Sequence, residues 1–355
     1  MILFGTSKGL VLCDEVGNIQ EVFFSGFPVS MVYEDPRHNT WWAGISHRHW
    51  GQKLYCTQDQ GKNWTQIPTP KFPPNTEIKP GKPASLKQIW CMSHGGPDKN
   101  DRIWLGTEPG ALFVSNNRGT SFELVESLWD HPSRSKETQW FGAGKDHPFI
   151  HTIEVDPRNS DHVYIAVSCA GVFETWDGGG SWNPKNNGLI AAYLPNPGVE
   201  VGHDPHSMKI CQSHPNTIWQ QNHCGIFRTK DGGVLWENVT DEEGLADYGF
   251  GLCIDAHDPN IAWVIPADSD ESRVPPNLAL CVCKTTDGGK TWEPKRKGLP
   301  QDYCYDIVFR QSFANKGDLL VFGTTSGNVY LSHDTGESWK GIHTNLARVE
   351  SVIIT

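Results

Sequence analysis

The chain has 355 residues, a net charge of −11 and 37% hydrophobic residues. This acidity argues against a nucleic-acid-binding protein, because contacts to phosphates need clustered Lys and Arg side chains. The sequence has no run of 18 apolar residues and no basic segment leading into an apolar stretch, so it predicts neither a membrane span nor a signal peptide. The ten cysteines follow no disulfide or CxxC spacing, so we expect free thiols and a cytoplasmic protein.

The N-terminal segment predicts three strands, at residues 2–6, 9–13 and 19–24, without a strand before them that would be the first of four. At the other end of the chain, residues 349–355 predict one further strand on its own. We expect this C-terminal strand to complete the N-terminal sheet, since closing a ring of sheets removes exposed strand edges.

Between the two ends one motif, Ser/Thr-x-Asp-x-Gly-x-x-Trp, recurs six times. The copies lie at residues 57–64, 115–122, 175–182, 229–236, 285–292 and 332–339, and the second copy has Asn117 and Phe122 in place of Asp and Trp. Asp bonds nearby backbone N–H groups, Gly accepts the positive φ of a tight turn, and Trp packs against a neighbouring sheet. The motif therefore predicts a strand–turn–strand unit with a structural role.

Further strand-like runs precede each motif, as residues 152–155, 162–168 and 171–175 do before the third copy. Four strands per repeat predict an all-β fold, a seven-bladed β-propeller that forms a single domain over residues 1–355. The predicted blades are residues 1–25 with 348–355, then 26–68, 86–126, 149–186, 204–240, 248–295 and 302–342.

The six motifs resemble the bacterial neuraminidase repeat, or Asp box, of sialidases, xyloglucanases, sortilin-type receptors and photosystem II assembly-factor-like proteins. The whole chain resembles bacterial proteins described as BNR-repeat glycosyl hydrolases or exo-α-sialidase-like proteins, also at residues 106–113, 220–225 and 273–276. The resemblance implies a propeller and a glycosidase-like hydrolase. A true sialidase is not expected, because the early Phe/Tyr-Arg-Ile-Pro motif is missing and most arginines lie in turns.

In a propeller, the connections that enter a blade and those between its second and third strands share one face, at the mouth of the channel. His151 and His206 would start the innermost strands of two blades, since residues 151–155 and 206–210 share one pattern; His223 and Glu108 would approach the same mouth. The three histidines suit a divalent metal such as Zn²⁺. Without metal, they could act as general acid and base with Glu108 or an acidic residue at 268–271. A third interpretation is structural, with His151 and His206 only capping strands.

Further residues of this face are predicted to bind substrate: His47, His49, Trp50, Gln221, Arg273, Tyr303 and Tyr305. The long loop 127–146 is predicted to cover the mouth. We therefore expect an enzyme, a glycosidase-like hydrolase or a lyase, acting on a small carbohydrate-like ligand with or without metal assistance. The alternative is a non-catalytic propeller that binds a ligand or acts as an assembly scaffold. The partner is expected to be a small molecule, neither nucleic acid nor membrane; the sequence does not indicate the oligomeric state.

Overall fold

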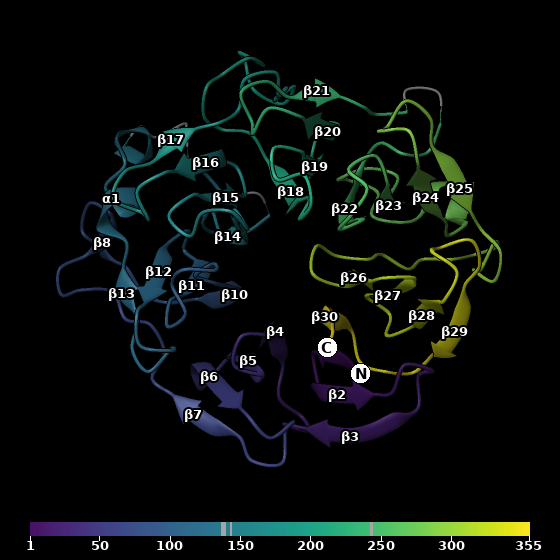
Figure 1. Cartoon of the computed structure of the whole chain (residues 1–355), viewed down its shortest axis with the longest axis horizontal. Coiled ribbons are helices and arrows are strands. Elements are labelled where there is room, and N and C mark those ends of the chain that lie inside the picture. Colours follow the sequence, from purple (N-terminus) through teal and green to yellow (C-terminus); the bar gives the residue numbers. More distant parts are fainter. Residues whose placement is uncertain (136–139, 143, 242–243) are drawn as a thin grey trace. The chain divides into compact units, whose positions relative to one another are not determined.

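The computed structural model describes residues 1–135, 140–142, 144–241 and 244–355. The chain is a seven-bladed β-propeller, as the repeats predict: the described residues form seven four-stranded antiparallel sheets and one two-stranded sheet (Figure 1). The fold divides into two compact units. The first comprises Met1–Val29, Asn187–Gly198 and Pro205–Thr355, and the second comprises Ser30–Asn186 and Val199–Asp204.

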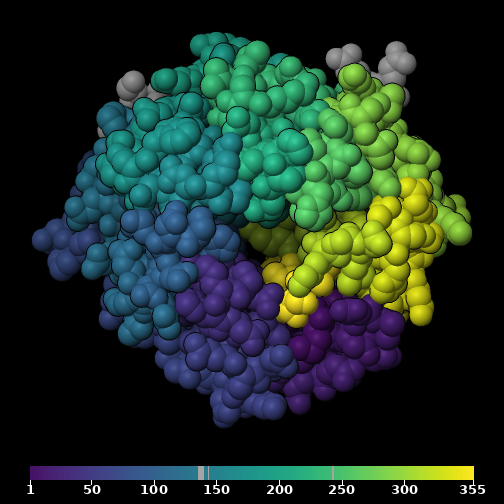
Figure 2. All heavy atoms as spheres, in the orientation of Figure 1, coloured from purple at the N-terminus to yellow at the C-terminus, as the bar shows by residue number. Residues whose placement is uncertain are grey.

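The first unit contains four of the seven sheets. Their strands are β1 (Ile2–Thr6), β2 (Gly9–Cys13), β3 (Ile19–Phe23) and β30 (Val349–Ile354); β18 (Pro205–Ile210), β19 (Ile218–Asn222), β20 (Gly225–Thr229) and β21 (Glu237–Asn238); β22 (Gly249–Ile254), β23 (Ala262–Pro266), β24 (Val282–Thr285) and β25 (Glu293–Lys295); β26 (Phe313–Lys316), β27 (Leu319–Gly323), β28 (Val329–Ser332) and β29 (Lys340–His343). The short 3₁₀ helix η2 (Pro276–Leu278) lies between β23 and β24. Side chains fill the space between the green sheets β18–β21 and β22–β25 (Figure 2).

The second unit contains the other three four-stranded sheets. Their strands are β4 (Val29–Asp35), β5 (Thr40–His47), β6 (Gly51–Thr57) and β7 (Thr65–Ile67); β10 (Gln88–His94), β11 (Ile103–Glu108), β12 (Leu112–Ser115) and β13 (Glu123–Leu124); β14 (Ile150–Val155), β15 (Val163–Val167), β16 (Gly171–Thr175) and β17 (Asn183–Pro184). The small hairpin of β8 (Glu77–Lys79) and β9 (Lys82–Pro83), the helix α1 (Glu126–Trp129) and the 3₁₀ helix η1 (Pro132–Ser135) connect these sheets. None of the described helices is long and apolar enough to cross a membrane.

The first sheet is completed by the C-terminal strand, as predicted. β30 pairs antiparallel with β1, in a register that sets Ile2 against Ile354 and Phe4 against Val352. Val349 and Val352 of β30 are buried in one cluster with Ile2 and Phe4 of β1. The two ends of the sequence are thus joined in one sheet, whose strand order is β3-β2-β1-β30.

The repeated motif forms the turn between the third and fourth strands of its sheet. In the copy between β16 and β17, the Thr175 hydroxyl donates to Asp177 Oδ1 at 2.7 Å and accepts from the Gly179 N–H at 3.0 Å. The Asp177 carboxylate also accepts from Ser181, and hydrogen bonds from Ser181 and Thr175 lower its pKa to about 2. The same hydroxyl bonds recur in the second copy, where the Asn117 side-chain oxygen replaces the carboxylate.

In several sheets, a tryptophan on the second strand explains why the motif turn of a following sheet needs its glycine. Trp42, Trp104 and Trp263 are fully buried, and each lies against the turn of a following sheet in its own unit. A Cβ on Gly119 would come within 2.3 Å of the Trp42 ring, and one on Gly336 would come within 3.0 Å of Trp263. Both glycines also have positive φ, so the position requires Gly for space as well as conformation.

Candidate functional site

In four sheets, the first strand contains a β-bulge, and the residue at the bulge has an aromatic or imidazole side chain. The register of the first strand with the second skips Trp90 in β10, His151 in β14, His206 in β18 and Phe250 in β22. A bulge leaves its extra residue out of the ladder and redirects that side chain. The predicted correspondence of His151 and His206 therefore has a backbone cause, and Trp90 and Phe250 share the position.

His206 is buried in the first unit and held in one orientation. Its ring stacks on Phe250 with centroids 4.6 Å apart and planes inclined by 22°. Its Nδ1 lies 2.7 Å from the Gly249 carbonyl oxygen. Because a carbonyl can only accept, Nδ1 carries the proton and the neutral ring has its lone pair on Nε2. That nitrogen can bind a metal or accept a proton.

His223 follows β19 and brings a second imidazole to the same place. Its ring centroid lies 5.7 Å from that of His206 and 5.6 Å from that of Tyr248. Tyr193 contacts His223 edge to face at 5.0 Å. We call His206, His223, Tyr193, Tyr248 and Phe250 the His206 cluster; all five belong to the first unit.

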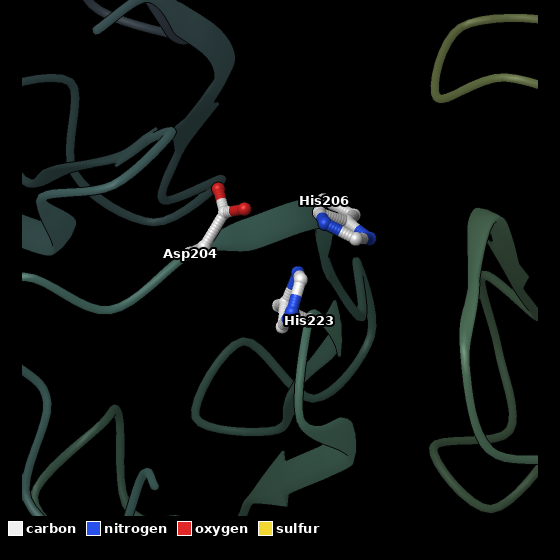
Figure 3. Close-up of side chains that lie close together, drawn as sticks. All are labelled: Asp204, His206 and His223. Carbon is white, nitrogen blue, oxygen red and sulfur yellow. The ribbon is translucent and has the colours of Figure 1, made fainter. Parts of the chain in front are cut away.

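The His206 cluster offers metal-binding atoms. His206 and His223 each offer one ring nitrogen as a ligand atom, and these two atoms lie within 4.8 Å of each other (Figure 3). Imidazole nitrogens are ligands that Zn²⁺ and similar ions accept.

The loop between β23 and β24 adds charged groups to the His206 cluster. Asp270 Oδ2 lies 3.7 Å from His223 Nε2, in the loop where the sequence predicts an acidic partner. The exposed Arg273 places its guanidinium carbon 5.6 Å from the Phe250 ring centroid, and the Arg310 guanidinium carbon lies 5.2 Å from the same centroid.

The other predicted binding residues of the first unit fall into two kinds. Gln221 is buried, and its side-chain nitrogen donates to the backbone oxygens of Asp247, Asn222 and Gly225, so it braces the loops that carry His223 and Tyr248. Tyr303 and Tyr305, in the segment before β26, are 83% and 61% exposed. Tyr303 has a φ of 53°, an uncommon conformation for a bulky residue.

In the second unit, Glu108 and His151 lie among aromatic rings. Glu108, at the end of β11, is 6% exposed, and burial raises its pKa although Lys145 lies 3.6 Å away. The Lys145 ammonium lies over Trp90, Trp90 stacks on Phe149 at 4.1 Å, and Phe149 contacts His151. His151 Nδ1 lies 2.9 Å from the Thr152 hydroxyl. A carboxyl with a raised pKa is suited to donating a proton.

The remaining predicted residues lie at the end of β5 and in the turn that follows it. The Nδ1 of His47 accepts from the backbone N–H groups of His49 and Trp50 at 3.1 and 3.0 Å, so His47 shapes the turn. Trp50 is 73% exposed. The predicted covering loop 127–146 is described only in part: residues 136–139 and 143 lie outside the described residues.

The structure thus brings His206 and His223 together in the first unit. In the second unit, a series of contacts through Lys145, Trp90 and Phe149 connects Glu108 to His151. Sequence reasoning missed Tyr193, Tyr248 and Phe250. A usable signal exists for Phe250, because the run Gly249–Ile254 begins its sheet as Pro205–Ile210 does.

No family model matches this chain. The oligoxyloglucan-reducing end-specific xyloglucanase of Emericella nidulans is 23% identical over 300 residues, which make up 81% of this chain and 30% of that protein. The chain therefore spans less than a third of this curated relative.

Solved structures share the fold at low sequence identity. An ancestral GH74 enzyme has a TM-score of 0.59 at 16% identity, over 93% of this chain and 37% of that one. YCF48 from Cyanidioschyzon merolae has a TM-score of 0.54 at 15% identity, over 94% of both chains. A protein described as a 6-phosphogluconolactonase from Bacteroides uniformis has a TM-score of 0.59 at 11% identity, over 100% of this chain and 98% of that one. These likenesses agree on the propeller.

Proposed function

We propose that this chain is a glycoside hydrolase that binds a carbohydrate at the His206 cluster. The observation that carries the proposal is the pair of imidazoles, His206 and His223, whose ring centroids lie 5.7 Å apart among aromatic rings. The Asp270 carboxylate lies beside His223. Similarity to a xyloglucanase supports a carbohydrate substrate. Aromatic rings suit the apolar faces of sugars, and the exposed Trp50, Tyr303 and Tyr305 could serve as such platforms in their own units.

Cleavage of a glycosidic bond needs an acid that protonates the leaving oxygen and a base that takes a proton from water. His206 can accept a proton at Nε2, because Nδ1–H is committed to the Gly249 carbonyl. His223 can transfer a proton with Asp270 orienting its ring. Glu108 and His151 form a second candidate pair in the second unit, and the raised pKa of Glu108 supports a proton-donating role.

Metal assistance is a second form of the same proposal. His206 and His223 could hold a divalent ion such as Zn²⁺. A bound ion of this kind polarises a substrate oxygen or activates water. In this form the Gly249 carbonyl orients His206 for the metal, since a ligating imidazole commonly donates its other N–H to such an acceptor.

The test is hydrolysis of a panel of neutral and acidic oligosaccharides, xyloglucan fragments included, measured as new reducing ends. We expect His206→Ala and His223→Ala to lower kcat/KM by roughly 100-fold or more, the usual contribution of an acid–base group. Glu108→Gln and His151→Ala test the second pair in the same assay. His214→Ala is the matched control, because His214 lies in the turn between β18 and β19 and contacts Ser213.

If cleavage occurs and both the His206→Ala and His223→Ala proteins keep wild-type kinetics, the His206 cluster is not the active site. The non-catalytic alternative is favoured by one observation: YCF48 matches 94% of this chain with 94% of its own length, whereas the GH74 enzyme is far longer. Binding of an oligosaccharide without cleavage would support that alternative as a ligand-binding propeller.

A further inference from the structure

One imidazole and two guanidinium groups lie close to the ring of Phe250. His206 stacks on the ring at 4.6 Å. The guanidinium carbons of Arg273 and Arg310 lie 5.6 and 5.2 Å from the same ring centroid. The two arginines come from different segments, one after β23 and one before β26. Within a chain whose net charge is −11, this concentrates positive charge beside the His206 cluster.

The loop that carries Arg273 is braced by its own backbone. The Asp268 N–H donates to the Val274 carbonyl at 2.8 Å, and the Ser269 N–H donates to the Ser272 carbonyl at 3.1 Å. Arg273 Nε donates to the Asp270 carbonyl at 3.2 Å. The same loop therefore fixes both the carboxylate beside His223 and the guanidinium over Phe250.

The terminal nitrogens of the Arg273 guanidinium can donate hydrogen bonds to a ligand. Among the described residues, no carboxylate lies within ion-pair distance of Arg273, and its one hydrogen bond uses Nε. The two terminal nitrogens of a guanidinium form a planar fork that matches a carboxylate with two parallel hydrogen bonds. Asp270, three residues before Arg273, has its carboxylate directed to His223.

We infer that the carbohydrate bound at the His206 cluster is acidic, and that Arg273 binds its carboxylate while Arg310 adds positive charge. This inference rests on the proposed function and specifies its substrate class as sugars with a uronic acid group. Recognition of a carboxylate adds a charge-assisted contact that the corresponding neutral sugar, with a hydroxymethyl group, does not make. Arg273 is thus a specificity-determining residue.

The test is isothermal titration of matched pairs: oligosaccharides of glucuronate and glucose, of galacturonate and galactose, and of mannuronate and mannose. We expect at least one acidic member to bind ten-fold or more tightly than its neutral partner, with an affinity that falls as salt rises. Arg273→Gln should remove that preference, and Arg273→Lys should retain part of it, because an ammonium keeps the charge without the planar fork.

Arg296→Gln is the control, since Arg296 follows β25 and donates to the Gln301 side chain; it should keep the preference. Equal binding within every pair, or a preference that survives Arg273→Gln, would overturn the inference. Tighter binding of a sugar phosphate than of any uronate would overturn the carboxylate assignment. Cleavage of neutral sugars that depends on His206 would leave the proposed function standing without this inference, whereas absence of any sugar binding would defeat both.

Discussion

A backbone carbonyl determines the chemistry available to His206. The contact of Nδ1 with the Gly249 oxygen fixes the tautomer, and the stack on Phe250 fixes the plane of the ring. An imidazole held in this way has lost most of its rotational freedom before a ligand arrives. Preorganised ligands bind metals and substrates more tightly, because the ordering cost is not incurred on binding.

The metal form of the proposal makes a prediction for individual residues. Equilibrium dialysis against Zn²⁺ should yield one bound ion per chain, because the imidazoles of His206 and His223 place two ligand nitrogens within 4.8 Å of each other. His206→Ala and His223→Ala should each weaken binding by at least ten-fold, since each removes one ligand. His214→Ala should bind as the wild type does. Stoichiometric binding that survives both cluster substitutions would place the ion elsewhere.

How far the sequence predicts these residues depends on what surrounds each one. The shared pattern of residues 151–155 and 206–210 predicts that His151 and His206 correspond, and the bulges in β14 and β18 give the reason. Phe250 has the same place in β22, but flanking glycines hide the pattern. Tyr193 could not be predicted, because the segment 187–198 contains no strand and reaches His223 only through the tertiary fold.

At the scale of elements, the sheet β14–β17 contains a buried ionic network. His162, before β15, directs Nδ1 to Asp156 Oδ2 at 2.9 Å and Nε2 to Glu174 Oε1 at 3.0 Å. Lys185 Nζ lies 3.0 Å from the second oxygen of Glu174, and Arg158 pairs with Asp156. Both ring nitrogens of His162 thus face carboxylates. The network fastens the turn after β14 to the third strand, β16.

The network makes stability depend on pH. Burial by itself would raise the pKa of Glu174, but hydrogen bonds from His162 and Lys185 outweigh burial and hold the pKa below its usual value. The pKa of Asp156 is lowered in the same way, by Arg158 and His162 against burial. A carboxylate whose pKa is depressed on folding stabilises the fold above its unfolded pKa of about 4, and this stability is lost as pH falls through the folded value.

Glu174→Gln should therefore lower the free energy of unfolding at pH 7 by about 3 kcal/mol, because it removes the buried carboxylate that pairs with Lys185. The difference from the wild type should shrink below about pH 4, where the wild type loses the same charge. Denaturant unfolding at pH 7, 5 and 3 measures both effects. Glu237→Gln is the control, since its pair with Lys230 is exposed. A pH-independent difference would contradict the electrostatic account.

For the whole molecule, six motifs and two chain ends suffice to predict seven blades. Five motifs supply the same hydroxyl–carboxylate–glycine bonds, and the Asn117 side-chain oxygen replaces the carboxylate in the second copy, so local chemistry specifies each turn without help from the rest of the fold. The first sheet depends instead on a pairing between residues more than 340 positions apart. The sequence predicts this pairing only because both ends are incomplete without it. The bulges and the loop contacts of the His206 cluster have no comparable sequence signal.

Removing β30 tests this dependence. A chain ending at Arg348 should lose about 3–6 kcal/mol of stability, because Val349 and Val352 are buried and each buried aliphatic side chain contributes about 1.5–3 kcal/mol. It should also associate with itself more readily, since β1 would become an unpaired edge. Thermal unfolding and sedimentation measure the two effects.

A peptide of residues 349–355 provides the decisive arm of this experiment. Added in trans, it should raise the Tm of the truncated chain in a concentration-dependent manner, because an extended peptide can add to an open sheet edge and β30 pairs with β1 in a defined register. A scrambled peptide of the same composition should have no effect. If the truncated chain unfolds at the wild-type temperature, or if both peptides act alike, closure of the first sheet by β30 does not stabilise the propeller.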